Sequence, residues 1–177
     1  GTKWELLDNR LYLSGALFDI SQQNILISQD AGKGQVETTQ AGEQHHRGLE
    51  LSATGYMTQA FSLNASMMAL DAEIKDKFDA SINGNRPIDV PELAGSLWAR
   101  YAFDQGTDLN LGAIYQGNRY GDAKNTYKKD AYTRFDAGVA HTIKYDENLD
   151  LIMRVNLENL LDTDYLKGGN EKGTVLG

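Results

Sequence analysis

Two groups of residues in the sequence have side chains of the types that bind metal ions. His45 and His46 are adjacent, and four acidic residues lie close together further along the chain. Neighbouring residues of a strand point to opposite faces, so the two histidines cannot easily share one ion and fit solvated wall positions better. The acidic group lacks the spacing of an EF-hand loop and is more typical of a hydrated, exposed loop. We therefore predict no metal site; the acidic group comprises Asp71, Glu73, Asp76 and Asp79.

The composition excludes several other kinds of chemistry. The chain has no cysteine, which excludes a disulfide scaffold, a zinc–thiolate site and a cysteine nucleophile. Lys and Arg number 17 against 25 for Asp and Glu, giving a formal net charge of -8, whereas a nucleic-acid-binding protein needs a basic footprint. No apolar run approaches the roughly 18 residues of a transmembrane helix. We predict no catalytic residues and no nucleic-acid partner.

The elements that must position any functional residue are predicted to be β-strands. Apolar and polar residues alternate over residues 93–103, where Leu93, Leu97 and Tyr101 share one face and Ser96 and Arg100 share the other. Such alternation is the pattern of a strand with one apolar face. The same alternation recurs in residues 10–20, 49–57, 61–69, 109–115, 135–145 and 149–157.

The two faces of these strands differ sharply in charge. In the clearest strands the apolar row contains no Asp, Glu, Lys or Arg, which indicates a fully desolvated face. The opposite row is wet, and its charged residues are Glu50, Glu92, Arg100, Arg134, Asp136, Lys144, Asp150, Arg154 and Glu158. An apolar face alone is also found in a sandwich or a lipocalin, so other features must decide between them.

The connections and the aromatic residues favour a membrane wall. Short and long connections alternate along the chain, as outer-membrane barrels alternate short periplasmic turns with long extracellular loops. Short connections are predicted at 58–60, 104–108 and 146–148, and long ones at 71–90 and 121–130. Aromatic residues at both ends of the apolar row indicate two interfacial girdles; they are Phe61, Tyr101, Phe103 and Tyr145 beside short turns, and Tyr115 and Phe135 towards long loops.

The predicted fold class is therefore all-β: an antiparallel up-and-down transmembrane β-barrel, here a partial barrel of about seven or eight meandering strands. Residues 2–7 are interpreted as the tail of an eighth strand, and residues 35–46 as a continuation of the third strand above the membrane. The alternative is an ordinary soluble β protein with aromatic residues at its strand ends.

Five short segments carry a resemblance to a known family. Each is degenerate alone, but their order and spacing are specific together. They are ALFDI at 16–20 with Asn24, RGLEL at 47–51, PELAGSLWARY at 91–101, GAIYQGNRYGD at 112–122 with Asn125, and VNLENLLDTDY at 155–165. In these segments the sequence resembles the C-terminal part of the barrel of TonB-dependent outer-membrane receptors, in particular the ferric-siderophore branch.

The resemblance implies that the chain is part of a larger protein. Such receptors have an N-terminal plug and a 22-stranded barrel. Residues 1–177 are expected to be the C-terminal portion of that barrel, with the plug domain, the TonB-binding segment and the last strand absent. Two open sheet edges would remain, and open edges are not tolerated in lipid. We expect the isolated piece to self-associate through these edges or to aggregate without detergent.

The function implied by the resemblance is energy-coupled uptake of ferric siderophores across the outer membrane of a Gram-negative bacterium. The ferric chelate is then the transported ligand rather than a cofactor, and no cofactor is expected. The partners implied are the chelate, outer-membrane lipid and the TonB complex, which would act through the missing N-terminal part. A cobalamin or a metal-free substrate stays an alternative cargo, because a fold does not fix a function.

Candidate ligand-binding residues are the aromatic and basic residues in or near the long loops. Aromatic rings offer rigid, flat contact surface, and arginine can pair with the anionic oxygens of a chelate. The alternative is that each of them is a girdle anchor, a loop-packing residue or a solvated charge. The candidates are Phe78, Arg86, Arg119, Tyr120, Tyr127, Tyr132, Tyr165 and Lys167.

Two rival classes of function stay open at this point. One is an outer-membrane enzyme of the small-barrel kind, which would need a nucleophile or a His–Asp pair at the extracellular rim; no such spacing is evident. The other is a small soluble β-barrel that binds an apolar ligand with its apolar face turned inward. A carrier of that kind stays soluble without detergent, so a detergent requirement separates it from a membrane wall.

Overall fold

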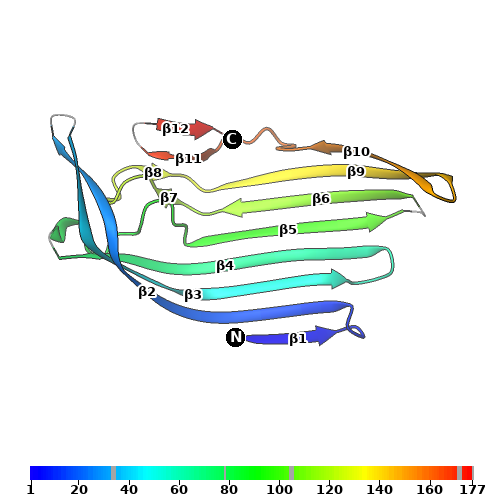
Figure 1. The fold of residues 1–177 in the computed structure, drawn as a ribbon, viewed down its shortest axis with the longest axis horizontal. Helices are drawn as coiled ribbons and strands as arrows, with labels where there is room; N and C mark the ends of the chain where they lie inside the picture. Colours follow the sequence, from blue (N-terminus) through cyan, green and yellow to red (C-terminus); the bar gives the residue numbers. More distant parts are fainter. Residues whose placement is uncertain (33–34, 78, 104–105, 171–172, 177) are drawn as a thin grey trace.

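A single antiparallel sheet dominates the computed structural model, which describes residues 1–32, 35–77, 79–103, 106–170 and 173–176. The sheet has eight strands in the order β1-β2-β3-β4-β5-β6-β9-β10, so each strand pairs with its sequence neighbours in the sheet (Figure 1). These strands are β1 Thr2–Leu6, β2 Leu11–Gly32, β3 Gln35–Tyr56, β4 Phe61–Asp76, β5 Leu93–Ala102, β6 Thr107–Gln116, β9 Tyr132–Asp146 and β10 Leu149–Leu157.

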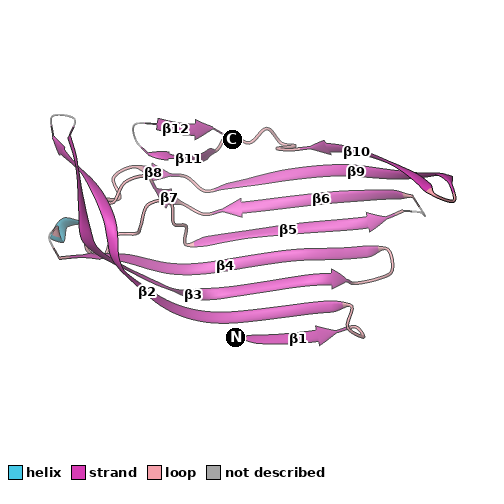
Figure 2. Ribbon diagram, viewed as in Figure 1, coloured by secondary structure: helices cyan, strands magenta, loops and turns pink. Residues whose placement is uncertain are grey.

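Small elements decorate one end of the sheet. A 3-10 turn, η1 (Ala80–Ile82), follows β4, and two-stranded hairpins form from β7 (Arg119–Tyr120) with β8 (Lys128–Lys129) and from β11 (Leu166–Asn170) with β12 (Gly173–Leu176). Figure 2 shows that strands make up nearly all of the regular structure. The predicted all-β meander is confirmed, and the sheet is not closed, because β1 and β10 form its two edges.

The apolar row of the sheet lies on its exposed outer face. Leu17, Leu111 and Val155 are 80%, 49% and 65% exposed, and no second layer covers them within the described part of the chain. The opposite row lines two hollows; the larger hollow includes Ser14, Glu50, Ser52, Ser66 and Gln116. The predicted division into an apolar outer face and a wet inner face is therefore confirmed, and an apolar row turned inward, as in a soluble carrier, is not the arrangement found.

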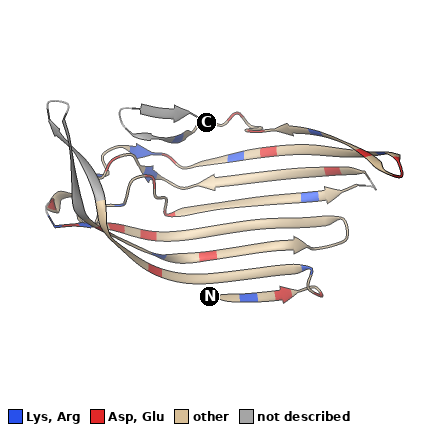
Figure 3. Cartoon of the chain, viewed as in Figure 1, with Lys and Arg blue, Asp and Glu red and all other residues tan. Residues whose placement is uncertain are grey.

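Buried hydrophobic residues are correspondingly few in the described segments: Leu11, Ala72, Ile74, Ile82 and Tyr165. The sheet therefore depends on its hydrogen-bonded ladders, and its outer face has the apolar surface that a hydrocarbon environment would cover. Figure 3 shows that charged residues are sparse along the middle of the strands. The described residues include no helix that is long and apolar enough to span a membrane.

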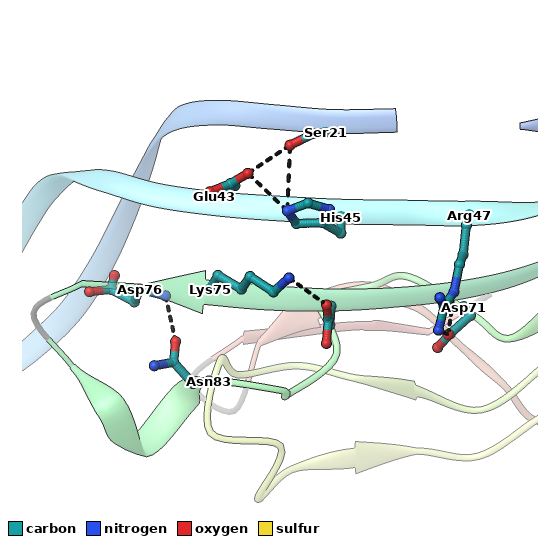
Figure 4. Close-up of polar contacts among 9 residues, drawn as sticks. Ser21, Glu43, His45, Arg47, Asp71, Lys75, Asp76 and Asn83 are labelled. Atoms are coloured by element: carbon teal, nitrogen blue, oxygen red, sulfur yellow. Dashed lines mark hydrogen bonds and ion pairs between the residues drawn. The ribbon is translucent and has the colours of Figure 1, made fainter. Parts of the chain in front are cut away.

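Charged and aromatic residues bound the apolar row at its two ends. Asp19, Arg47 and Asp71 are register partners on β2, β3 and β4, and they follow directly on the apolar positions of the row. Arg47 Nη2 lies 2.8 Å from Asp71 Oδ2 (Figure 4). At the short-turn end the rings of Tyr101 and Phe103 meet edge to face with centroids 5.0 Å apart. Tyr101 and Phe103 therefore lie beside a short turn, as predicted.

One predicted boundary was wrong at the long-loop end. The segment assigned to a loop from residue 71 begins with strand, because β4 continues to Asp76. Beyond Asp71 the buried residues become Ala72, Ile74 and Asp76, on the inner row, while the outer row turns polar. The alternation thus persists with its apolar side reversed, since the outer face is wet there and Ile82 packs against Ile74 on the inside.

Candidate ligand-binding site

Three loop segments come together at the long-loop end of the sheet. They are residues 79–92 between β4 and β5, residues 117–131 between β6 and β9, and residues 158–167 after β10. In Figure 1 the β7–β8 hairpin lies close to β11 at this end. Some of the side chains that join these segments are predicted site residues, such as Arg119, and others, such as Lys129, were not predicted.

Arg119 lies at the centre of these contacts and is only 4% exposed. Its guanidinium donates hydrogen bonds to the carbonyl oxygens of Leu166 and, at 3.2 Å, Lys167. Arg119 Nη1 lies 3.6 Å from Asp89 Oδ1. The guanidinium carbon also lies 5.9 Å from the ring centroid of Tyr132, which is within the range of a cation–π contact. One buried side chain of the second segment therefore contacts both of the other segments.

A second arginine holds the segment after β10 against the inner wall. The Tyr132 and Tyr165 rings stack with centroids 4.2 Å apart, and the Tyr165 hydroxyl accepts a hydrogen bond from Arg134 Nη1 at 3.2 Å. Arg134 Nη2 also donates to Asp136 Oδ2 at 2.8 Å. The other Asp136 oxygen accepts the backbone N–H of Asn159 at 2.9 Å. This cluster explains why the NLENLLDTDY segment turns back towards β9 where it leaves the sheet.

The turn itself depends on Asn159. Its backbone adopts a left-handed conformation, with φ of 53°, which asparagine tolerates better than most residues. Its side-chain oxygen accepts the N–H of Thr163 at 2.9 Å, and its amide donates to the Thr163 carbonyl at 3.1 Å. These bonds close a compact turn that delivers Tyr165 to its place beside Tyr132.

Asp122 organises the loop between β6 and β9. Its carboxylate accepts the Tyr127 N–H at 2.7 Å, and it accepts both the N–H and the hydroxyl of Thr126. Burial raises the pKa of the Asp122 carboxyl, but these hydrogen bonds to its charged form outweigh burial, and the pKa lies below its usual value. The loop is therefore held by a carboxylate that stays ionised at neutral pH.

Asn125 ties this loop to the preceding one. Its side-chain oxygen accepts the Arg86 N–H at 2.8 Å, and its amide donates to the Arg86 carbonyl at 2.9 Å. Asn85 Nδ2 donates to the Ala123 carbonyl at 3.0 Å. Because backbone groups of one loop are satisfied by the other, the two loops form one packed body.

The predicted site residues fall into distinct places. Arg119, Tyr132 and Tyr165 are brought together, and Lys167 joins them through its carbonyl while its side chain stays exposed. Arg86 lies apart from this group; its guanidinium donates to the Leu70 carbonyl and to Glu92.

The tyrosines of the second loop are half-buried. The Tyr120 carbonyl accepts the N–H of Asp89 at 2.9 Å, and the Tyr127 ring packs so closely on Gly121 that an added Cβ there would lie 2.5 Å from ring atom Cδ1. Phe78 lies outside the described residues. That these residues contact a ligand stays a prediction.

Several residues of the cluster were missed as site residues. Lys129 is fully buried, and its ammonium lies 2.5 Å from Asp89 Oδ1. Asp136 and Arg134 were recognised as charges on the wet row, but nothing in the strand pattern indicated that they would bind the segment after β10. No local signal identifies Asp89, because its partners come from residues about 30 and 40 positions away. Asn125 and Asn159 lie within or beside segments that carried the family resemblance, which was the one available signal.

A serine, a histidine and a glutamate contact one another on the outer face of β2 and β3 (Figure 4). They can be compared with the catalytic group that an outer-membrane enzyme would need at the extracellular rim. Ser21 Oγ donates to Glu43 Oε1 at 2.7 Å, and His45 Nε2 lies 2.8 Å from the same oxygen. In a catalytic triad the carboxylate binds the histidine nitrogen that faces away from the serine. Here Ser21 Oγ lies 3.5 Å from His45 Nε2, the same nitrogen that contacts Glu43, so the arrangement is not that of a proton relay.

The same contacts bear on the predicted absence of a metal site. Hydrogen bonds from Ser21 and His45 lower the pKa of the Glu43 carboxyl. His46 instead contacts Gln44, which is consistent with opposite faces for the two histidines. The acidic run is occupied by ion pairs such as Glu73 with Lys75 at 3.0 Å. The described residues contain no group of three His, Cys, Asp or Glu side chains that could hold a metal ion.

Comparisons with known proteins agree with this architecture. Residues 1–160 match the family model described as TonB dependent receptor-like, beta-barrel. The chain is 33% identical, over 93% of its length, to the Probable TonB-dependent siderophore receptor PiuA of Acinetobacter baumannii. It is 30% identical, over 98% of its length, to the Catecholate siderophore receptor Fiu of Escherichia coli K12. In each case it spans 22% of the relative, about a fifth of that protein's length.

Solved structures show the same fold. The crystal structure of the siderophore receptor PiuA from Acinetobacter baumannii superposes with a TM-score of 0.80 at 28% identity, covering 99% of this chain and 25% of that one. The unliganded ferric citrate transporter FecA gives a TM-score of 0.79 at 23% identity, covering 99% of this chain and 28% of that one. At that identity the second likeness concerns the fold alone.

Proposed function

Because the chain belongs to the TonB-dependent receptor β-barrel family, we propose that it is part of an outer-membrane receptor for TonB-dependent uptake of ferric siderophores. The relatives reported above are named as siderophore receptors, which supports this choice of cargo. The cellular location proposed is the outer membrane of a Gram-negative bacterium. In that setting the exposed apolar row of β2–β6 faces lipid.

The observation that carries the proposal is the gathering of arginine and tyrosine side chains at the loop end of the inner wall. Arg119, Tyr132, Arg134 and Tyr165 form one contact group there. Both guanidinium groups are bonded to protein partners, so this group would hold the loops in place rather than pair with the chelate. Basic and aromatic side chains beside it would contact an anionic chelate with flat groups. The ligand would meet the half-buried Tyr120 and Tyr127 and the exposed Lys167 side chain at the same end.

The proposed action involves binding and translocation without covalent chemistry. The two relatives reported are named as siderophore receptors, and neither is named as an enzyme. Energy would reach the receptor through a partner, the TonB complex, acting on parts of the protein other than this wall. The wall would supply the lipid-facing surface and one side of the ligand-binding mouth.

The proposal is tested with the full-length receptor and a panel of ferric chelates. Deleting the gene should abolish growth on at least one ferric siderophore as the sole iron source, and removing TonB should abolish uptake while leaving ligand binding intact. Growth unchanged on every iron source, or strict dependence on a cobalamin, would overturn the assignment of cargo.

Site residues are tested by affinity in the same receptor. Replacing Tyr120 and Tyr127 together by alanine should weaken chelate binding about tenfold, since each aromatic contact contributes about 0.5–1.5 kcal/mol. Tyr145→Ala is the matched control, because Tyr145 is 76% exposed at the short-turn end of the outer face. Unchanged affinity in the double variant would remove both tyrosines from the site.

We further propose that the isolated chain pairs its sheet edges with another copy. β1 and β10 each have a strand neighbour on one side only, and β10 is exposed along its whole length. Such edges carry unpaired backbone groups that bind another strand. Purified residues 1–177 should therefore elute as dimers or larger species in detergent and aggregate without it. A monodisperse, detergent-free monomer at high protein concentration would contradict this.

A further inference from the structure

Arg119 occupies an unusual position for a residue with so many contacts. It lies on β7, which is two residues long and pairs with β8 rather than with the main sheet. Its side chain is nevertheless 5% exposed, far less than that of Arg47 or Arg100 on the long strands. A buried guanidinium on so short an element must be held by its partners rather than by its strand.

The partners of Arg119 come from three separate stretches of chain. The Leu166 and Lys167 carbonyls belong to the segment after β10, Asp89 to the loop before β5, and Tyr132 to the start of β9. Asp89 is also held by Lys129 on β8, and its N–H donates to the Tyr120 carbonyl. Arg119 therefore lies where three stretches of chain meet, and these stretches do not belong to one strand.

The type of side chain matters at this point. An arginine presents a planar fork of donors that can bond two neighbouring carbonyl oxygens and still lie over an aromatic ring. A lysine carries the same charge as a compact ammonium on a flexible stem, so it can keep an attraction to Asp89 but cannot reproduce the fork. Arg119 Nε is buried and has no hydrogen-bond partner among the described residues. The hydrogen bonds of the guanidinium to Leu166 and Lys167 are therefore made by its two terminal nitrogens.

We propose that Arg119 is a positioning residue that couples the segment after β10 to the loop containing Asp89, so that the two move together at the mouth of the receptor. When Leu166 and Lys167 shift, the guanidinium loses two hydrogen bonds while it stays buried, which is costly. If Arg119 moves with Leu166 and Lys167, it keeps these two hydrogen bonds. It then keeps its contact with Asp89 only if the loop containing Asp89 moves as well. The coupling belongs to the ligand-free wall; its use during chelate binding rests on the proposed function.

Arg86 provides an internal control for this idea. Like Arg119 it donates to a backbone carbonyl, that of Leu70, and pairs with a carboxylate, that of Glu92. Its side chain is 13% exposed, so it is nearly as buried. Both partners of the Arg86 guanidinium, however, lie on β4 or just before β5. Replacing Arg86 therefore removes similar interactions without affecting the segment after β10.

The experiment is amide hydrogen exchange of the full-length receptor in detergent, without ligand. In Arg119→Lys the amides of 165–170 should exchange at least tenfold faster than in the wild type, while those of 86–92 stay within about twofold. In Arg119→Gln both segments should exchange faster, because the charge facing Asp89 is lost as well. Arg86→Lys should leave 165–170 unchanged, and protection in β5 and β6 reports that each variant is folded.

Three results would overturn the proposal. They are wild-type exchange of 165–170 in Arg119→Lys, equal acceleration of that segment by Arg86→Lys, and acceleration of 165–170 alone in Arg119→Gln. A second set of measurements adds a ferric siderophore that the wild type binds. The chelate should slow exchange in both segments of the wild type but in only one segment of Arg119→Lys. If no chelate binds, the proposed function fails, whereas the ligand-free result still decides the coupling.

Discussion

Placing an arginine at position 67 is expected to destabilise the barrel by about 2–4 kcal/mol, the cost of a cationic side chain on the lipid face near the middle of the membrane. Met67 is 40% exposed on the outer row of β4, between Leu51 of β3 and Gly95 of β5. The row continues on this strand from Phe61 to Ala69, so position 67 lies within the apolar belt, one outer-row position from its middle. The guanidinium would be forced to reach for an interface or thin the bilayer.

The adjacent residue provides the matched control. Met68 is chemically identical, but it faces the inner wall. Its register partner on β3 is Glu50, and the open hollow around it also includes Ser52 and Ser66. An arginine at this position meets water and a carboxylate, so Met68→Arg should change stability by no more than about 0.5 kcal/mol.

Both variants are measured in the full-length receptor. The readouts are denaturant unfolding in lipid vesicles and the yield of folded, heat-resistant protein in outer membranes. Equal losses in the two variants, or a larger loss for Met68→Arg, would show that the outer row does not face hydrocarbon.

Asp136→Asn is expected to have the second large effect, a loss of about 2–3 kcal/mol, slightly less than for a fully buried pair because Arg134 keeps some exposure. Asp136 is 5% exposed and accepts hydrogen bonds from Arg134 and from the Asn159 backbone. Neutralising it leaves the Arg134 charge, on a side chain only 19% exposed, without its counter-ion. The turn that carries Tyr165 should loosen with it.

Asp108→Asn is the control for this prediction. Asp108 also faces an arginine on the inner wall, with Arg100 Nη2 2.7 Å from its carboxylate, but both side chains are more exposed, at 24% and 42%. Ion pairs in water contribute little, so the expected loss is about 0.5 kcal/mol. Urea unfolding of the full-length receptor, combined with protease sensitivity of the segment after β10, measures both. A ranking with Asp108→Asn more damaging would refute the role given to burial.

Much of the fold could be predicted from the sequence because one face of each strand is apolar and the other is polar. Over 93–101 the two-residue period of the side chains is not interrupted, so the apolar and wet rows could be assigned without knowing any contact. Near residue 71 the same reasoning failed. The outer row turns polar there and the inner row apolar, because loop residues such as Ile82 cover the inside at that level.

The candidate site was only partly accessible from the sequence. Residue type and loop position selected Arg119, Tyr132 and Tyr165, which do meet. Loop position could not indicate that Arg119 would be buried or that Asp89 would lie beside it, since these contacts join segments separated by about 30 residues or more. Whether the grouped residues bind a ligand is the prediction that the affinity measurements address.

By itself the sequence determined the strand pattern and the side of each strand that avoids water, because these properties depend on neighbours two residues apart. It also indicated the antiparallel meander, because the lengths of the connections are local to the chain. The tertiary structure decided where the loops go and which charges are buried, as for Asp136 and Lys129. Loop backbones have no periodic pattern of burial, so their shape is set by hydrogen bonds between distant segments. Only the folded wall brings those segments together.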